Sequence, residues 1–124
     1  MFFENLLLAT GNRGKYEEFR AILPESFVGS LLFAPEVGGL AVEETGGSYA
    51  MNAVLKAKAW AEASGLPSLA DDSGLEVAAL GGLPGVRSAR IVEGTDEDRN
   101  RWLLSQMEGR SDRRARFVAA LALS

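Results

Sequence analysis

A glycine-containing segment near the N-terminus, TGNRGK at residues 10–15, carries residue types that suit a phosphorylated ligand. Glycines let the backbone N–H groups approach an anion, and a following helix adds the positive potential of its N-terminus. Arg13 and Lys15 add two full charges. The segment predicts a polyphosphate site, although a plain strand-to-helix turn with solvated Arg13 and Lys15 fits the same pattern. It is not a Walker loop, because Ala9 stands at the first glycine position and Tyr16 follows the lysine.

A second segment, DDSG at residues 71–74, places two carboxylates side by side. Adjacent carboxylates repel each other, so a fold seldom places both in a tight site without a cation. At the end of a strand their side chains diverge, so one would face a site and the other would brace the loop. Ser73 would donate a hydrogen bond to a phosphate or a sugar. From this segment alone, a common Asp/Ser/Gly surface turn is the better interpretation.

Two acidic residues, Glu43 and Glu44, precede a helical pattern that carries Asn52 and Lys56 one turn apart on one face. A glutamate brought near Asp72 would complete an oxygen-ligand magnesium site, and Lys56 would reach the same phosphates. From periodicity alone, a solvated acidic loop and a surface lysine describe the pattern better.

A glycine-rich stretch at residues 80–90, LGGLPGVRSAR, implies a shaped loop. Such a loop either forms a pocket wall or is purely structural. Arg87 and Arg90 would serve phosphates or pair with the aspartates.

Composition limits the number of domains and the kinds of catalytic and metal sites that the chain can form. The chain has 124 residues, 47% hydrophobic and 24% charged, which is typical of one globular domain over residues 1–124. Cysteine and histidine are both absent, which excludes disulfides and a histidine triad and argues against zinc. A metal would be bound by oxygen, which indicates Mg²⁺ or Mn²⁺.

Charge and hydropathy exclude other classes. The formal net charge of -4 argues against general nucleic-acid binding, which needs clustered Lys and Arg, but leaves room for a small anionic ligand. The longest apolar runs are too short to span a bilayer, and the N-terminus lacks a secretory signal. We therefore expect a cytoplasmic protein.

The elements that must position these residues follow from periodicity and turn signals. Helix boundaries are marked by Pro24, Gly65 and Thr95. The helix at 48–64 is expected to bury Met51, Val54 and Leu55, with Trp60 as a further candidate. The alternation of elements predicts an α/β or α+β fold. Strands are expected at residues 5–10, 27–34, 68–70, 75–80 and 114–124, and helices at residues 15–23, 48–64 and 96–107.

In order and spacing, these segments resemble the inosine triphosphate pyrophosphatase family, also called the house-cleaning dITP/XTP pyrophosphatases. The resemblance covers nearly the whole chain: LLLATGNRGKYEEFRAIL, EETGGSYAMNAVLKAKA, LADDSGLEVAALGGLPGVRSAR and RRARFVAALAL occur in the family's order. The combination of TGNxGK with ADDSGLxVxxLxGxPGxxSAR is highly specific.

The resemblance implies a role for each matching residue. Asp72 would be the general base and a magnesium ligand, Ser73 would contact the substrate, and Lys56 would reach the phosphates. Glu43 or Glu44 would be a further metal ligand, and the choice between them stays open. Triphosphate binding would fall to Thr10, Gly11, Asn12, Arg13, Gly14 and Lys15.

The resemblance also implies a fold, a reaction and an assembly. The fold would be a twisted mixed sheet flanked by helices, in two lobes with a nucleotide cleft, of the ITPase-like or Maf-like type. The reaction would convert dITP, ITP or XTP to the monophosphate and pyrophosphate. Its cofactor would be Mg²⁺, with Mn²⁺ as a substitute. The protein would be a homodimer.

One departure affects the expected activity. Family members continue past position 124 with a Phe-Gly-Tyr-Asp segment, a further lysine and a Ser-His-Arg motif, and none of these occurs in this sequence. We therefore expect a chain that lacks the C-terminal part of the family, with weak or no activity and poor base selectivity if it acts alone. The alternatives are a catalytically impaired nucleotide-binding or dimerising fragment, or an unrelated α/β domain with structural glycine loops.

Overall fold

The computed structural model describes residues 1–124 and divides into two compact units. The first unit comprises Met1–Asp71 with Leu121–Ser124, and the second comprises Asp72–Ala120. The strands are β1 (Phe3–Leu8), β2 (Val28–Phe33), β3 (Ser68–Val77) and β4 (Ala115–Leu123). The helices are α1 (Arg13–Ile22), α2 (Ala34–Val37), α3 (Tyr49–Ser64) and α4 (Asp96–Met107), with 3₁₀ turns η1 (Ala78–Leu80) and η2 (Gly85–Arg87).

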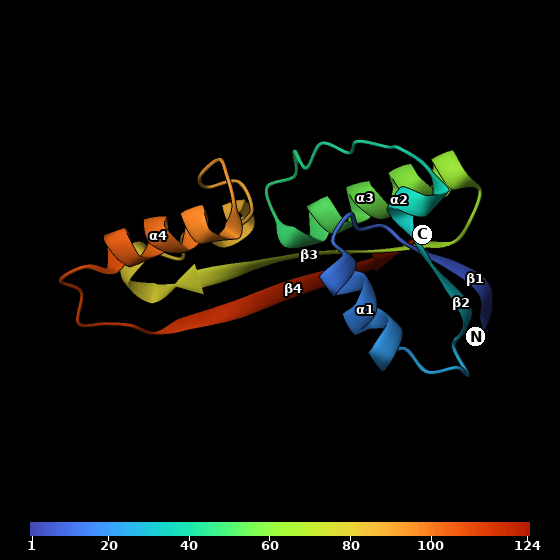
Figure 1. The fold of residues 1–124 in the computed structure, drawn as a ribbon, viewed down its shortest axis with the longest axis horizontal. Coiled ribbons are helices and arrows are strands. Elements are labelled where there is room, and N and C mark those ends of the chain that lie inside the picture. The colour runs from blue at the N-terminus through green and yellow to red at the C-terminus, as the bar shows by residue number, and fades with distance from the viewer. The chain divides into compact units, whose positions relative to one another are not determined.

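The strands form one mixed sheet in the order β2-β1-β3-β4 (Figure 1). β1 pairs in parallel with β2, Leu8 opposite Phe33, and in parallel with β3, Leu8 opposite Leu69. Ser68 and Ser124 exchange both backbone hydrogen bonds, which is the antiparallel pattern, so β4 runs opposite to β3. The mixed sheet with its helices confirms the predicted fold class.

In the first unit, helices cover both faces of the strands (Figure 1). Leu7 and Ala9 pack with Ala57 and Trp60 of α3. Side chains alternate along a strand, so Leu8 points to the other face. On that face Tyr16 of α1 stacks against Phe33, with ring centroids 5.1 Å apart, and donates a hydrogen bond to the Leu31 carbonyl. The result is a helix-sheet-helix sandwich.

The helix α3 turns a different face to the sheet from the one predicted. The predicted core residues Met51, Val54 and Leu55 are 56%, 42% and 38% exposed, so that prediction was wrong, whereas Trp60 is buried as expected. The buried side chains are mostly small, because alanines let the helix lie close to the strands. They are Asn52, Ala53, Ala57 and Trp60.

The strand β3 is one continuous strand of 10 residues, where the sequence predicted two short strands around a turn. Asp71 and Asp72 are buried within it, so the surface-turn alternative was wrong. In the second unit, Ser88 stabilises the extended conformation: its hydroxyl accepts from the Leu75 N–H and donates to the Gly85 carbonyl. Gly74 faces that carbonyl at a distance that leaves no room for a side chain.

The remaining predicted elements are present with small shifts at their ends. Thr95 forms a capping box with Asp98 at α4, as predicted. Asn12 caps α1, which therefore begins at Arg13 rather than at the predicted residue 15. The helix α2 starts at the last residue of the predicted strand 27–34 and continues into residues for which no helix was predicted, although Pro35 in its first turn is a typical helix-start signal. None of the helices combines the length and apolar character that a membrane span requires.

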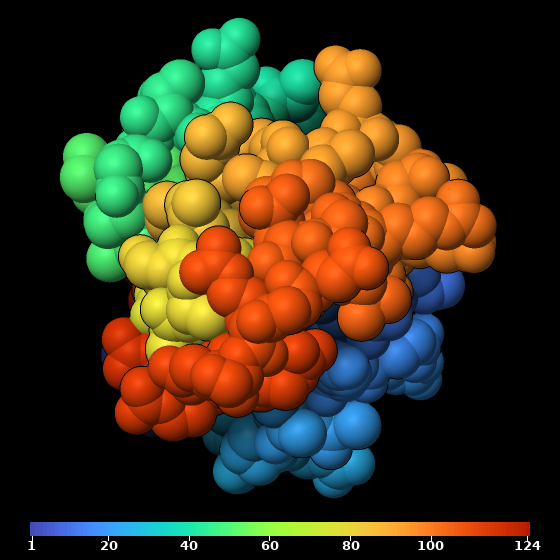
Figure 2. Space-filling view, turned by 90° about the vertical axis from the view of Figure 1, so that its left-hand side faces the viewer, coloured from blue at the N-terminus to red at the C-terminus, as the bar shows by residue number.

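The second unit contains α4, both 3₁₀ turns and the parts of β3 and β4 that pair with each other there. The Ala78 N–H donates to the Arg114 carbonyl, and Glu76 pairs with Arg116 across the two strands. The segment between α4 and β4 lies on the surface (Figure 2).

We predict that Gly74→Ala destabilises the protein by about 1–3 kcal/mol, because the new methyl group would collide with the Gly85 backbone, which cannot move aside as a side chain can. Urea unfolding followed by circular dichroism measures the change. Gly38→Ala is the control, since no atom lies within 4 Å of the position that a methyl group would take there. Equal stability of both variants would contradict the close packing of β3 on this turn.

Candidate functional site

The order of the parallel strands creates a crevice at their carboxyl ends in the first unit. The connection that leaves β1 contains α1 and lies on the face of Leu8 and Phe33. The connection that leaves β2 contains α3 and lies on the opposite face, against Leu7 and Ala9. Where connections from neighbouring parallel strands diverge in this way, α/β proteins bind their ligands.

A cavity of about 380 Å³ lies at this position. The loop after β1, the segment after β2 and one face of α3 contribute to its wall. Its lining combines apolar side chains, glycine backbone and one acid–base pair, which suits a ligand with both polar and apolar parts. The lining residues are Ala9, Thr10, Gly11, Ala34, Pro35, Gly38, Gly39, Leu40, Val42, Glu44, Lys56 and Trp60.

The charged residues of the cavity are Glu44 and Lys56, which form an ion pair with 2.9 Å between Oε1 and Nζ. Their side chains are 23% and 17% exposed, so both remain accessible from the cavity. The neighbouring Glu43 is exposed and is not part of the lining. Of the two glutamates predicted as alternatives, the structure therefore brings Glu44 together with Lys56.

The phosphate-loop candidates take different roles. Thr10 and Gly11 line the cavity. Asn12 caps α1 by accepting a hydrogen bond from the Lys15 N–H, and its own N–H donates to the Thr10 hydroxyl. Gly14 lies in the first turn of α1. These bonds hold the loop in one conformation at the wall of the cavity.

Arg13 is directed toward α2 rather than toward the cavity. Its guanidinium donates to Glu36 at 3.0 Å and lies 4.5 Å from the centre of the Phe33 ring. It also forms a longer ion pair with Glu17. Arg13 is absent from the cavity lining, so the structure does not bring this candidate to the site.

Lys15 binds Asp71, with 2.8 Å between Nζ and Oδ2. The Asp71 side chain is 7% exposed and that of Lys15 is 32% exposed. The second carboxylate oxygen of Asp71, Oδ1, is buried without a hydrogen-bond partner. The sequence left open which aspartate would brace the loop, and the structure assigns this contact to Asp71.

Asp72 and Ser73 lie on β3 in the second unit. Asp72 is 7% exposed and Ser73 is half-buried. Since side chains alternate along a strand, Asp72 points to the face opposite to that of Asp71. That Asp72 and the loop at 10–15 share one cavity stays a prediction.

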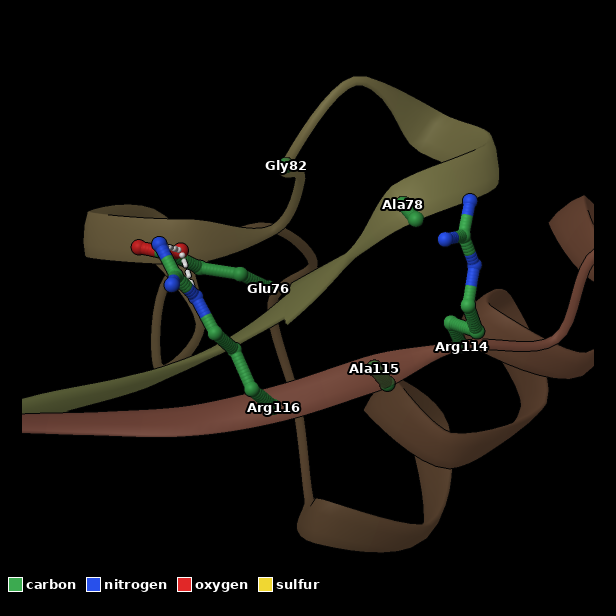
Figure 3. Close-up of a pocket in the computed structure, with 6 residues that line it drawn as sticks. All are labelled: Glu76, Ala78, Gly82, Arg114, Ala115 and Arg116. Carbon is green, nitrogen blue, oxygen red and sulfur yellow. Dashed lines mark hydrogen bonds and ion pairs between the residues drawn. The ribbon is translucent and has the colours of Figure 1, made fainter.

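A hollow of about 330 Å³ in the second unit is lined by charged residues that are already paired (Figure 3). The Nε–H of Arg116 donates a hydrogen bond to Oε1 of Glu76 at 2.9 Å, and Nη2 of Arg116 lies 2.8 Å from the same oxygen. Arg114 donates two hydrogen bonds to Asp112, which lower the pKa of this carboxyl to about 2. These pairs leave no surplus charge for a ligand. Arg87 and Arg90 are both exposed.

Sequence reasoning missed three features of the site. The helix α2 and the adjoining Gly38 and Gly39 form part of the cavity wall, and so does Trp60. The partnership of Asp71 with Lys15 joins residues 56 positions apart, so no local pattern reveals it. The chain contains no group of three or more acidic residues placed to hold a metal ion.

Fold and cavity together define an α/β protein with a candidate ligand site at the carboxyl ends of parallel strands. The profile of the Ham1 family matches residues 6–124. The chain belongs to the Ham1 family, which confirms the resemblance that the motifs indicated.

Related proteins agree with this assignment. A dITP/XTP pyrophosphatase of Synechococcus sp. is 50% identical, over 96% of this chain and 56% of that protein. A dITP/XTP pyrophosphatase of Symbiobacterium thermophilum is 49% identical, over 97% of this chain and 61% of that protein. The chain thus spans less than two thirds of the length of these relatives.

Solved structures show the same fold. The Ham1 protein of Staphylococcus aureus matches with a TM-score of 0.80 and 38% identity, over 98% of this chain and 63% of that one. A HAM1 protein of Coxiella burnetii matches with a TM-score of 0.83 and 37% identity, over 97% of this chain and 62% of that one.

We predict that the Lys15–Asp71 pair contributes a coupling free energy of about 1–2 kcal/mol to folding, because one partner is buried and its loss leaves the other charge unpaired. A double-mutant cycle with Lys15→Met and Asp71→Asn, followed by urea unfolding, measures it.

The matched control is the Glu17–Arg20 pair of α1, whose partners are 51% and 66% exposed and 3.9 Å apart. Its coupling should stay below about 0.5 kcal/mol. Equal couplings for the two pairs would show that Asp71 does not hold Lys15.

Proposed function

We propose that this chain contributes the catalytic part of a nucleoside triphosphate pyrophosphatase that converts dITP, ITP or XTP to the monophosphate and pyrophosphate. The observation that carries the proposal is the cavity at the ends of β1 and β2, where Thr10 and Gly11 meet Glu44 and Lys56. The named activity of the relatives supports the substrate class.

The polyphosphate is the part of the substrate that this cavity suits best. Thr10 and Gly11 offer a hydroxyl and backbone at its wall, and Lys56 offers an ammonium group. We infer that Lys15, one third exposed, reaches the phosphates while its contact with Asp71 is kept. An ammonium has three N–H donors, so it can serve both partners.

In the proposed reaction, Asp72 is the general base. Its carboxylate would accept a proton from the attacking water, whose oxygen forms a bond to the α-phosphorus. The bond from the α-phosphorus to the oxygen bridging it to the β-phosphorus breaks, and pyrophosphate leaves with the bonding electrons. Lys15 and Lys56 would offset the charge on the leaving group and hold the phosphate chain in line. Ser73 would donate a hydrogen bond to the substrate.

The residues present fit a magnesium ion. Mg²⁺ needs only one or two protein carboxylates, because phosphate oxygens and waters complete its shell. Glu44 supplies such a carboxylate in the cavity, and an oxygen donor of this kind suits a hard cation. Glu44 and Asp72 would hold the ion. When bound, Mg²⁺ or its substitute Mn²⁺ would neutralise phosphate charge as a Lewis acid.

The assembly and the location belong to the same proposal. The resemblance to the family implies a homodimer, and we expect it to act in the cytoplasm on a free nucleotide rather than on nucleic acid. The net charge of -4 agrees with a small-molecule substrate, since it disfavours long polyanions.

The first test is pyrophosphate release from inosine triphosphate with Mg²⁺ at alkaline pH. Asp72→Asn should lower kcat by about 10²–10⁴-fold, because the proton acceptor is lost, and Lys56→Met should lower kcat/KM by about 10²-fold. Lys58→Met is the matched control, since Lys58 is an exposed lysine on the same helix and should leave the rate unchanged. Nucleotide binding without any release would favour the impaired fragment, and no binding would exclude the site.

The second test removes the metal. A chelator should abolish release and added Mg²⁺ should restore it. Glu44→Gln should raise the half-saturating Mg²⁺ concentration by at least about tenfold, whereas Glu43→Gln should change it little, because Glu43 is exposed outside the cavity. The reverse result would make Glu43 the ligand.

A further inference from the structure

The segment that carries Glu44 has no regular secondary structure. Residues 38–48 connect α2 to α3 without a helical or strand hydrogen-bond ladder. A segment of this kind is held in place by individual side-chain contacts. Since Glu44 lies in the cavity, the contacts that fix this segment also fix the position of its carboxylate.

Asn52 makes one such contact. It lies in the first turns of α3, its exposed fraction is 0%, and its Oδ1 accepts a hydrogen bond from the Gly46 N–H at 2.8 Å. A buried amide is costly unless its polar atoms are paired. The bond therefore ties the segment firmly to the helix, two residues after Glu44.

Gly46 fits closely against this amide. A methyl group on Gly46 would lie 2.7 Å from the Asn52 Oδ1 and 2.7 Å from the Met51 Cβ. Both distances are shorter than a van der Waals contact allows, so only glycine permits the bond in this geometry. The contact depends on both partners and can be broken from either side.

Lys56, one helical turn after Asn52, makes the second contact, the ion pair with Glu44 itself. Residues four apart on a helix share a face, so α3 holds the segment at two points on one face. Lys56 would leave this pair or share it when phosphate and metal arrive, whereas the buried Asn52 bond is independent of the ligand. The Asn52 bond thus holds the segment when the ion pair is disturbed.

We propose that Asn52 is a positioning residue of the site: its bond to Gly46 holds the Glu44 carboxylate at the cavity, ready for a divalent cation. The assignment of Glu44 to the cation rests on the proposed function. The positioning of the segment by Asn52 does not.

The experiment compares Asn52→Leu with wild type by two measurements. Amide hydrogen exchange should become faster across residues 43–47, because the anchor of the segment is lost. In pyrophosphate release from inosine triphosphate, the half-saturating Mg²⁺ concentration should rise by about tenfold or more, as when a supporting contact of a metal ligand is removed. At saturating Mg²⁺, kcat should fall much less, because Asn52 is buried and does not line the cavity.

Two further variants separate positioning from a loss of stability. Asn52→Asp keeps the accepting oxygen and should restore most of the protection at Gly46. Ala61→Gly weakens the same helix by about 1 kcal/mol without touching the segment and should leave the Mg²⁺ dependence unchanged.

Breaking the contact from the other side keeps the proposal testable if Asn52→Leu does not fold. Gly46→Ala should reproduce its effects, and Gly47→Ala should not, since no atom lies within 4 Å of the methyl position at Gly47. Unchanged exchange at residues 43–47 in Asn52→Leu or Gly46→Ala would overturn the proposal, as would an unchanged Mg²⁺ dependence. A wild-type chain that neither releases pyrophosphate nor binds Mg²⁺-inosine triphosphate would refute the proposed function instead, and the exchange result would still decide the positioning role.

Discussion

The pairing of β1 with a parallel strand on each side is the constraint on which the first unit depends. Leu6, Leu7 and Leu8 have no exposed surface, and the strand that contains them bonds to both β2 and β3. Such a strand needs a helix on each face, and α1 and α3 provide these. Because the two helices approach from opposite faces, the loops after β1 and β2 separate, and the cavity forms between them.

Charge pairing then determines how the polar residues can lie near this apolar centre. A buried carboxylate is stable only with a cation or several donors. Asp71 has Lys15, and Glu44 has Lys56. In both pairs the lysine is carried by a helix, while the acid comes from a strand or an irregular segment. Helices α1 and α3 therefore supply both the covering of the sheet and the cations near the site.

Much of the fold follows from local signals, whereas the site depends on contacts that local signals do not contain. The cap at Thr95 acts on Asp98, three residues further on, so the sequence predicts the start of α4. The alanine-rich α3 has apolar residues on all sides, so periodicity does not identify its buried face. The continuity of β3 depends on Ser88, which is 13 residues from Leu75.

The same distinction applies to the candidate residues. Family motifs pointed to Lys56 and left Glu43 and Glu44 as alternatives, and only the structure shows which of the two glutamates faces the cavity. Arg13 has the right type and spacing for a phosphate ligand, but the ring of Phe33 and the carboxylate of Glu36 attract it elsewhere. Residue type predicts chemistry, but the neighbours in space determine where the side chain points.

The ion pair between Glu44 and Lys56 has a consequence for how a ligand would approach. Two opposite charges 2.9 Å apart act at a distance as a dipole, and the field of a dipole falls off faster than that of a single charge. The pair therefore contributes little to long-range attraction of an anion, and its influence begins only when the ligand is within a few ångströms. Recognition by these two residues would then be an exchange of partners at short range, with little sensitivity to the salt concentration of the surrounding solution.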